Sequence, residues 1–218
     1  MKKLLILFSV PLVASMLYAQ EQANRYAEIT NPKLLHINRE EPRSTFYSFT
    51  NMKEALDASY TSKGSEVVLL NGIWKFHYTD QFNERPKEGF QNPGFDDSGW
   101  SNIQVPGNWE VQGFGVPIYV NTTYEFTSPG HAPYWDKPNP PLVPEAFNPT
   151  GTYRKTFTLP DNWQEKEIIL CADATKGAAY YYLNGHFVGM NKEGKLPARF
   201  NVTNHAKAGE NVLAVQIH

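Results

Sequence analysis

The stretch AYYYLNGHFVG, residues 179–189, decides the fold of this chain. It consists of two runs rich in aromatic and aliphatic side chains on either side of Asn184-Gly185. An Asn-Gly pair favours a type I′ turn, because both central residues of that turn need positive φ. The stretch therefore predicts a β-hairpin. We expect the pleat to divide its tyrosines between the core and the surface.

Further strands are predicted on both sides of this hairpin. Residues 67–70 and 73–78 flank Asn71-Gly72, which is a second hairpin signal. Strands at this spacing, without a helix long enough to make a crossover, predict an all-β fold of two antiparallel sheets packed face to face. A jelly-roll β-sandwich fits this pattern best. The other predicted strands cover residues 151–159, 167–172, 199–202 and 211–218.

The remaining segments are irregular. Residues 20–64 are polar and lack a sustained period, so they predict an irregular N-terminal lead-in with a possible short helix at 52–58. The sandwich domain itself is expected over residues 65–218. Within it, the segment 89–151 is rich in proline, glycine and tryptophan. This composition predicts a long loop whose rings either pin it to the sandwich or serve a function.

The N-terminus has the pattern of a secretory signal peptide. Lys2 and Lys3 precede an apolar stretch over residues 4–17, and Tyr18-Ala19-Gln20 follows. The alternative, an uncleaved anchor, is weaker because the apolar stretch falls short of the ~20 residues that span a bilayer. We expect residues 1–19 to be removed, the mature chain to be periplasmic or extracellular, and no membrane span to remain.

Composition and motifs exclude several classes of function. The net charge of -2 is scattered, so the sequence offers no basic stripe for nucleic acid. Cys171 is the only cysteine, in a run that predicts a buried and inert thiol. The six histidines lack metal-binding spacing, and motifs for a serine nucleophile or a phosphate loop are missing. We predict no catalytic residue and no metal site in this chain, and a turn role for Asp96-Asp97.

Several motifs occur in a fixed order along the chain. They are LNGIWKF (70–76), FDDSGW (95–100), VPGNWE (105–110), GFGVPIYVNTTY (113–124), NPTGTYR (148–154), LNGHFVG (183–189), LPARFNVT (196–203) and GENVLAV (209–215). Together they resemble the start of the β-galactosidases of glycoside hydrolase family 2. The segment at 113–124 is the most specific, and the resemblance covers about residues 69–218.

The resemblance implies a role in sugar binding. In that family this domain is a jelly-roll sandwich packed against an (α/β)8 barrel, and one of its loops lines the galactose pocket. Asn121 matches the loop asparagine that contacts the sugar, with Tyr119 and Thr122 as companions. An amide offers both donors and an acceptor, which suits a neutral polyol. The alternative is that Asn121 only closes a turn.

The resemblance also implies where catalysis takes place. The family hydrolyses β-galactosides with retention, using two barrel glutamates that do not occur in this chain. The complete family enzyme commonly uses Mg²⁺ and a monovalent cation, and we expect neither to be bound here. The chain stops in mid-strand, which predicts an inactive N-terminal fragment whose partners are the barrel and the β-galactoside. The alternatives are a stand-alone exported carbohydrate-binding module and a purely structural or interaction domain.

Overall fold

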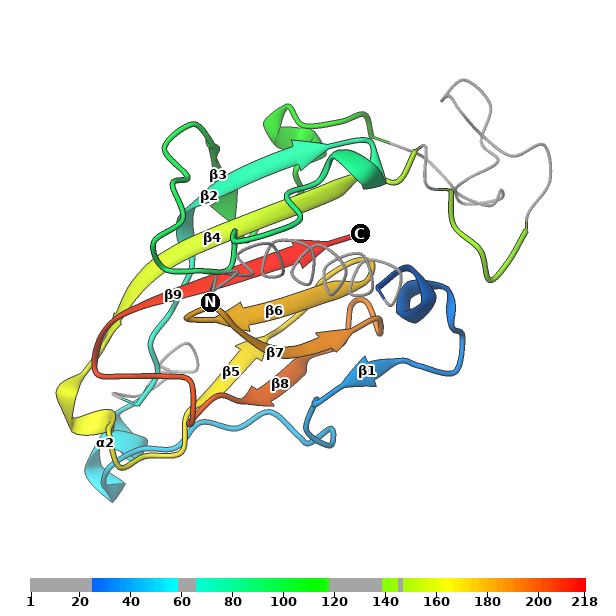
Figure 1. Ribbon diagram of the computed structural model, residues 1–218. Coiled ribbons are helices and arrows are strands. Elements are labelled where there is room, and N and C mark those ends of the chain that lie inside the picture. The colour runs from blue at the N-terminus through cyan, green and yellow to red at the C-terminus, as the bar shows by residue number, and fades with distance from the viewer. Residues whose placement is uncertain (1–24, 59–65, 118–138, 145–146) are drawn as a thin grey trace, which may run out of the picture.

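The computed structural model describes residues 25–58, 66–117, 139–144 and 147–218 (Figure 1). The described strands form a seven-stranded sheet, in the order β1-β7-β6-β9-β4-β2-β3, and a two-stranded sheet of β5 and β8. Every strand pair is antiparallel. The strands are β1 (His36–Ile37), β2 (Gly72–Thr79), β3 (Ser101–Val105), β4 (Thr150–Leu159), β5 (Ile169–Ala172), β6 (Ala179–Leu183), β7 (His186–Asn191), β8 (Ala198–Asn201) and β9 (Gly209–Ile217).

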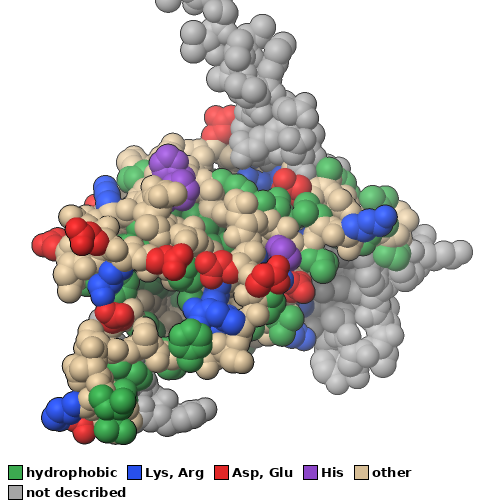
Figure 2. All heavy atoms as spheres, turned by 90° about the horizontal axis from the view of Figure 1, so that it is seen from below, with side chains coloured by type: hydrophobic (Ala, Val, Ile, Leu, Met, Phe, Trp, Pro, Cys, Tyr) green, Lys and Arg blue, Asp and Glu red, His purple; other side chains and the backbone are tan. Residues whose placement is uncertain are grey.

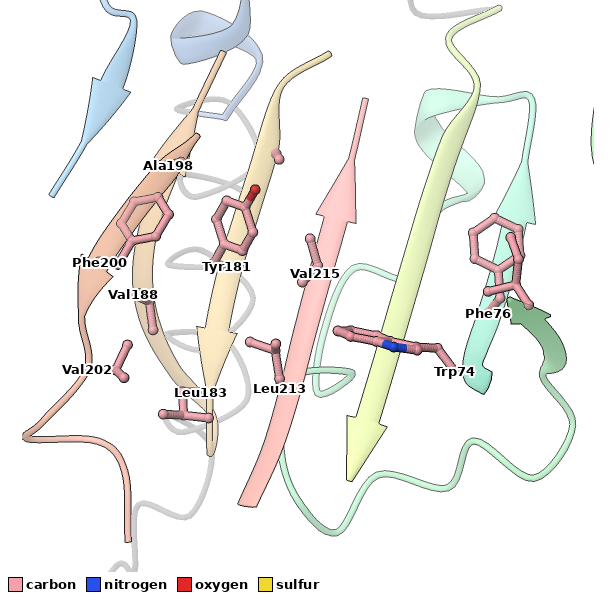
Figure 3. Packing of buried hydrophobic residues seen from close by; sticks show 12 residues of the cluster. Trp74, Phe76, Tyr181, Leu183, Val188, Ala198, Phe200, Val202, Leu213 and Val215 are labelled. Carbon is pink, nitrogen blue, oxygen red and sulfur yellow. The ribbon is translucent and has the colours of Figure 1, made fainter. Parts of the chain in front are cut away.

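The two sheets share one hydrophobic core. Leu213 and Val215 of β9 and Tyr181 of β6 face Phe200 of the small sheet, and Trp74 of β2 extends the core sideways (Figure 3). The rings of Tyr181 and Phe200 lie 4.9 Å apart between centroids. This arrangement confirms the predicted all-β fold of two antiparallel sheets packed face to face.

The tyrosines of the hairpin are buried on both faces of the large sheet. Tyr181 points into the shared core, whereas Tyr180 and Tyr182 point to the opposite face and pack with Phe90. All three are at most 5% exposed. The prediction that some would lie at the surface is therefore wrong, because the lead-in covers the second face: the Arg25 guanidinium lies 4.7 Å from the Tyr180 ring centroid.

One of the two predicted hairpins forms. Asn184 and Gly185 have φ of 52° and 90°, and they join β6 to β7 as predicted. The prediction of a hairpin at Asn71-Gly72 is wrong, since residues 67–70 do not form a strand. The structure gives the reason: β3 and β4 occupy both edges of β2, so the run before Gly72 has no free edge to pair with.

The lead-in is more regular than its composition suggests. The predicted short helix is confirmed as α2 (Met52–Asp57), and the Asn51 side chain caps it by accepting a hydrogen bond of 2.9 Å from the amide of Glu54. Residues 25–30 are also helical, and β1 adds to the edge of the large sheet beside β7. Similarly, β3 lies inside the segment predicted as a loop. The predicted signal peptide, residues 1–19, lies outside the described residues.

Cys171 is exposed, which corrects the prediction of a buried thiol. β5 belongs to a two-stranded sheet with one face on the core, and its neighbours Leu170 and Ala172 take the core positions. The period of two then turns Cys171 outward, where it pairs across the strands with Arg199. Because the apolar run at residues 167–172 has no alternation, the sequence did not show which face of this strand packs on the core.

The surface carries charges of both signs. Acidic and basic side chains are interspersed over the face shown in Figure 2. No helix in the described part of the chain is long and apolar enough to cross a membrane.

Candidate functional site

The three residues predicted to contact sugar, Tyr119, Asn121 and Thr122, lie outside the described residues. The structure does describe the two segments that flank them, residues 105–117 and 139–144, and the chain from 147 into β4. We call residues 109–117 the upstream root and residues 147–150 the downstream root. Together they determine from which part of the sandwich the predicted sugar-binding segment departs and returns.

The upstream root is tied to the end of β3 by one side chain. Gln112, at the end of the short 3₁₀ helix Glu110–Gln112, accepts a hydrogen bond of 2.8 Å from the amide of Gln104. Its Nε2 donates to the carbonyls of Gln104 at 3.0 Å and Asn108 at 3.3 Å. One amide therefore satisfies three backbone groups, which fixes the turn against the sheet.

Aromatic rings fasten the same root to the core. Phe114 meets Phe76 edge to face with centroids 4.8 Å apart, and Trp109 lies 6.1 Å from Phe76. Trp109 also meets Tyr78 edge to face at 5.8 Å. Phe76 is 1% exposed, so the root packs on a rigid part of the core. This confirms, for Trp109, the prediction that rings pin the long segment to the sandwich.

The downstream root is held by Asp80, which directly follows β2, and by His218. The amide of Asn148 donates to the carbonyl of Asp80 at 3.0 Å. The Thr150 hydroxyl donates to the Asn148 carbonyl at 3.1 Å and also lies 3.0 Å from Nδ1 of His218. Because the hydroxyl has only one proton, its oxygen accepts from Nδ1–H, which assigns the imidazole tautomer.

Burial favours the neutral form of two ionisable side chains near the roots, His218 and Tyr78. Burial of the ring lowers the pKa of His218 well below its usual value, and the charges of Arg85 and Arg25 lower it further. Burial also raises the pKa of Tyr78, with smaller contributions from the carboxylates of Asp80 and Glu110. The imidazole of His218 and the phenol of Tyr78 are therefore neutral groups beside the two roots.

The described residues hold no group of three or more His, Cys, Asp or Glu that could ligate a metal ion. A shallow groove does occur at the far end of β4, lined by Leu159, Trp163 and Thr203. It lies at the opposite end of the strand from Thr150 and is separate from the two roots.

Three arginines in the described part of the chain, Arg25, Arg85 and Arg154, are buried, and the sequence did not predict their burial. Arg154 of β4 forms an ion pair of 2.7 Å with Asp97, and Arg25 donates to the side-chain oxygen of Gln216 at 2.8 Å. The predicted turn role is confirmed for Asp96, which accepts from the amide of Ser98 at 3.0 Å. Asp97 does more than close a turn. No local signal connects it with Arg154, which is 57 residues away in the chain.

Comparison with known proteins gives a consistent result. Residues 67–218 match the family described as "Glycosyl hydrolases family 2, sugar binding domain". The chain is 42% identical over 149 residues to a β-galactosidase of Halalkalibacterium halodurans, covering 68% of this chain and 14% of that protein. It is 37% identical over 188 residues to a β-galactosidase of Psychromonas ingrahamii, covering 86% and 17%. The chain thus spans less than a fifth of the length of these curated relatives.

Among solved structures, a calcium-binding mutant of Bacteroides uniformis β-glucuronidase 2 is 28% identical with a TM-score of 0.46, and the match covers 67% of this chain and 14% of that one. A β-glucuronidase from Ruminococcus gnavus, in complex with D-glucaro 1,5-lactone, is 19% identical with a TM-score of 0.46, and covers 68% and 21%.

Proposed function

Since the chain belongs to the sugar-binding domain of glycosyl hydrolases family 2, as its motifs suggested, we propose that it forms the N-terminal sugar-binding portion of a β-galactosidase. In this role it contributes one loop to the galactose pocket, while the catalytic glutamates belong to a barrel domain outside this chain. The observation that carries the proposal is the match over residues 67–218, together with curated β-galactosidase relatives at 32–42% identity.

The placement of the two roots supports the loop assignment. The upstream root runs from the end of β3, where Gln112 binds Gln104, to Tyr78 near the end of β2. The downstream root leads into the start of β4, at the end of the large sheet where β2 and β9 end (Figure 1). A loop from this end can reach a domain that follows β9. In the proposal the amide of Asn121 pairs with sugar hydroxyls, and Tyr119 and Thr122 support it.

The proposal assigns catalysis and sugar binding to different domains. Retaining hydrolysis of a β-galactoside needs two carboxyl groups about 5 Å apart, one as acid/base and one as nucleophile. In our proposal the barrel supplies both, and this domain binds and orients the sugar. Binding energy from such contacts helps to hold the sugar in a reactive position.

Export is a further part of the proposal. Cleavage after Ala19 would leave a mature chain that starts at Gln20 and retains Arg25, which is 4% exposed and part of the fold. The mature protein would then work in the periplasm or outside the cell. N-terminal sequencing of the exported protein tests this, and a first residue other than Gln20 contradicts the proposed site.

The proposed division of labour is tested by the purified 218-residue chain. We expect it to release no product from a chromogenic β-galactoside, and we expect turnover when residues 67–218 replace the matching domain of the Halalkalibacterium halodurans relative. Turnover by the 218-residue chain alone would overturn the assignment of catalysis to another domain. Titration of the isolated chain with galactose distinguishes the alternative, because clear binding heat without a barrel indicates a stand-alone carbohydrate-binding module.

A further inference from the structure

We propose that the contact between Trp109 and Gly151 is a positioning device, which holds the upstream root on β4 and thereby sets how the following residues are presented to the sugar. The first part of this inference rests on described residues alone. The second part, presentation to the sugar, rests on the proposed function.

Gly151 lies directly beneath the indole of Trp109. A Cβ added to Gly151 would lie 2.4 Å from Cζ3 and 2.7 Å from Cε3 of Trp109, and 2.8 Å from Cε2 of Phe76. Gly151 is buried within β4, and its φ is not in the left-handed region. Its backbone conformation would therefore accept a residue with a Cβ atom. Glycine is needed here because the ring lies against the strand backbone.

The backbone of Trp109 transmits the position of its ring to the upstream root. Its carbonyl accepts hydrogen bonds from two amides, those of Gln112 at 3.0 Å and Phe114 at 3.1 Å. The amide of Gln112 belongs to the last residue of the 3₁₀ helix, and that of Phe114 to the turn that follows. A shift of the indole away from β4 therefore strains the two hydrogen bonds that close this turn.

A second glycine fixes the far side of the turn. Gly115 has φ of +73°, and a Cβ placed on it would lie 2.5 Å from the hydroxyl oxygen of Tyr78. The upstream root thus touches the sheet at two places where only glycine leaves room for a ring, one under Trp109 and one over Tyr78. Two separated contacts define the orientation of a segment as well as its position.

The device is tested first by hydrogen exchange of the 218-residue chain. In Gly151→Ala the added methyl group displaces the indole, and we expect the amides of Gln112 and Phe114 to exchange about tenfold faster, the scale of one overpacked contact. Gly99→Ala is the matched control, because nothing lies within 4 Å of its added Cβ and its φ is not positive. Urea unfolding of both variants separates this local effect from a loss of global stability.

Trp109→Leu tests the same contact from the other side, also if Gly151→Ala fails to fold. It should release the same two amides. Combining it with Gly151→Ala should add little to the exchange rate, because the contact has already been removed. Unchanged exchange in Trp109→Leu, or fully additive effects, would overturn the inference.

Kinetics in the chimera with the Halalkalibacterium halodurans relative separate this inference from the proposed function. We expect Trp109→Leu to raise KM for a β-galactoside severalfold while kcat changes less, as for the loss of a binding contact. Faster exchange with unchanged kinetics would support the positioning device but contradict a sugar-binding role for the segment that follows. A kinetic change without faster exchange would contradict the device and leave the proposed function supported.

Discussion

Replacing Arg154 with methionine tests how the segment over residues 89–100 is held on the large sheet. The guanidinium is 4% exposed and donates from Nε to Asp97 at 2.7 Å. Its Nη1 donates to the carbonyls of Phe90 and, at 3.0 Å, Asn92. It also lies 5.3 Å from the Phe95 ring centroid. One side chain from β4 therefore satisfies three acceptors in this segment.

The expected loss follows from these contacts. Methionine keeps most of the buried volume, so packing changes little, but the ion pair and the two carbonyl contacts are lost. Breaking a fully buried pair costs about 3–5 kcal/mol. Asp97 is 26% exposed and regains water, which favours the lower end of that range. We therefore expect the free energy of unfolding to fall by about 3 kcal/mol.

Urea unfolding of the 218-residue chain measures this difference. Lys155→Met is the matched control, since Lys155 neighbours Arg154 on the same strand but donates only to the exposed carbonyl of Ile73 at 2.8 Å. Its cost should stay below about 1 kcal/mol. If Arg154→Met and Lys155→Met destabilise the chain equally, the segment is not held by Arg154 and the reasoning is refuted.

Three further predictions concern single groups. Burial lowers the pKa of both His77 and His218, so the unfolded chain binds more protons than the folded one at low pH. The free energy of unfolding should therefore fall as the pH drops below about 6.5, and it should fall less steeply in His77→Gln. Urea unfolding at several pH values measures both effects. The Cys171 side chain is exposed, although partial desolvation raises the pKa of its thiol. A maleimide should therefore label the folded chain, and the labelling should be faster at pH 9 than at pH 7. Labelling only after unfolding would contradict the structure. Gly185 has φ of 90°, so Gly185→Ala should cost about 1–2 kcal/mol in urea, whereas Gly94→Ala, with open space around its Cβ, should cost less.

The parts of the fold that depend on local chemistry could be predicted from the sequence. Asn184-Gly185 specifies its turn through two positive φ angles, so the hairpin of β6 and β7 was predictable from neighbouring residues alone. The same dipeptide at 71–72 misled, because strand pairing also depends on which edges are free, and β3 and β4 take both edges of β2. Edge occupancy is a property of the whole sheet.

The burial of side chains by residues far away in the chain could not be predicted from the sequence. In the sequence, Arg25 belongs to a polar lead-in and Arg154 to a strand of alternating character, so both look like ordinary surface residues. Both are nevertheless 4% exposed and bind partners far away in the chain. Cys171 was assigned to the wrong side of its strand, because a continuous apolar run carries no alternation. At the candidate site, family resemblance supplied Asn121, and the structure supplied the support around Trp109.

The kinetics of Asn121→Ala in the chimera with the Halalkalibacterium halodurans relative test the central claim most directly. Asn102→Ala, at an exposed position on β3, is the control. If Asn121 pairs with galactose hydroxyls, kcat/KM for a β-galactoside should fall about 10- to 100-fold, the scale of one lost polar contact to the substrate. A value within twofold of the control would contradict the claim that this domain supplies part of the galactose pocket.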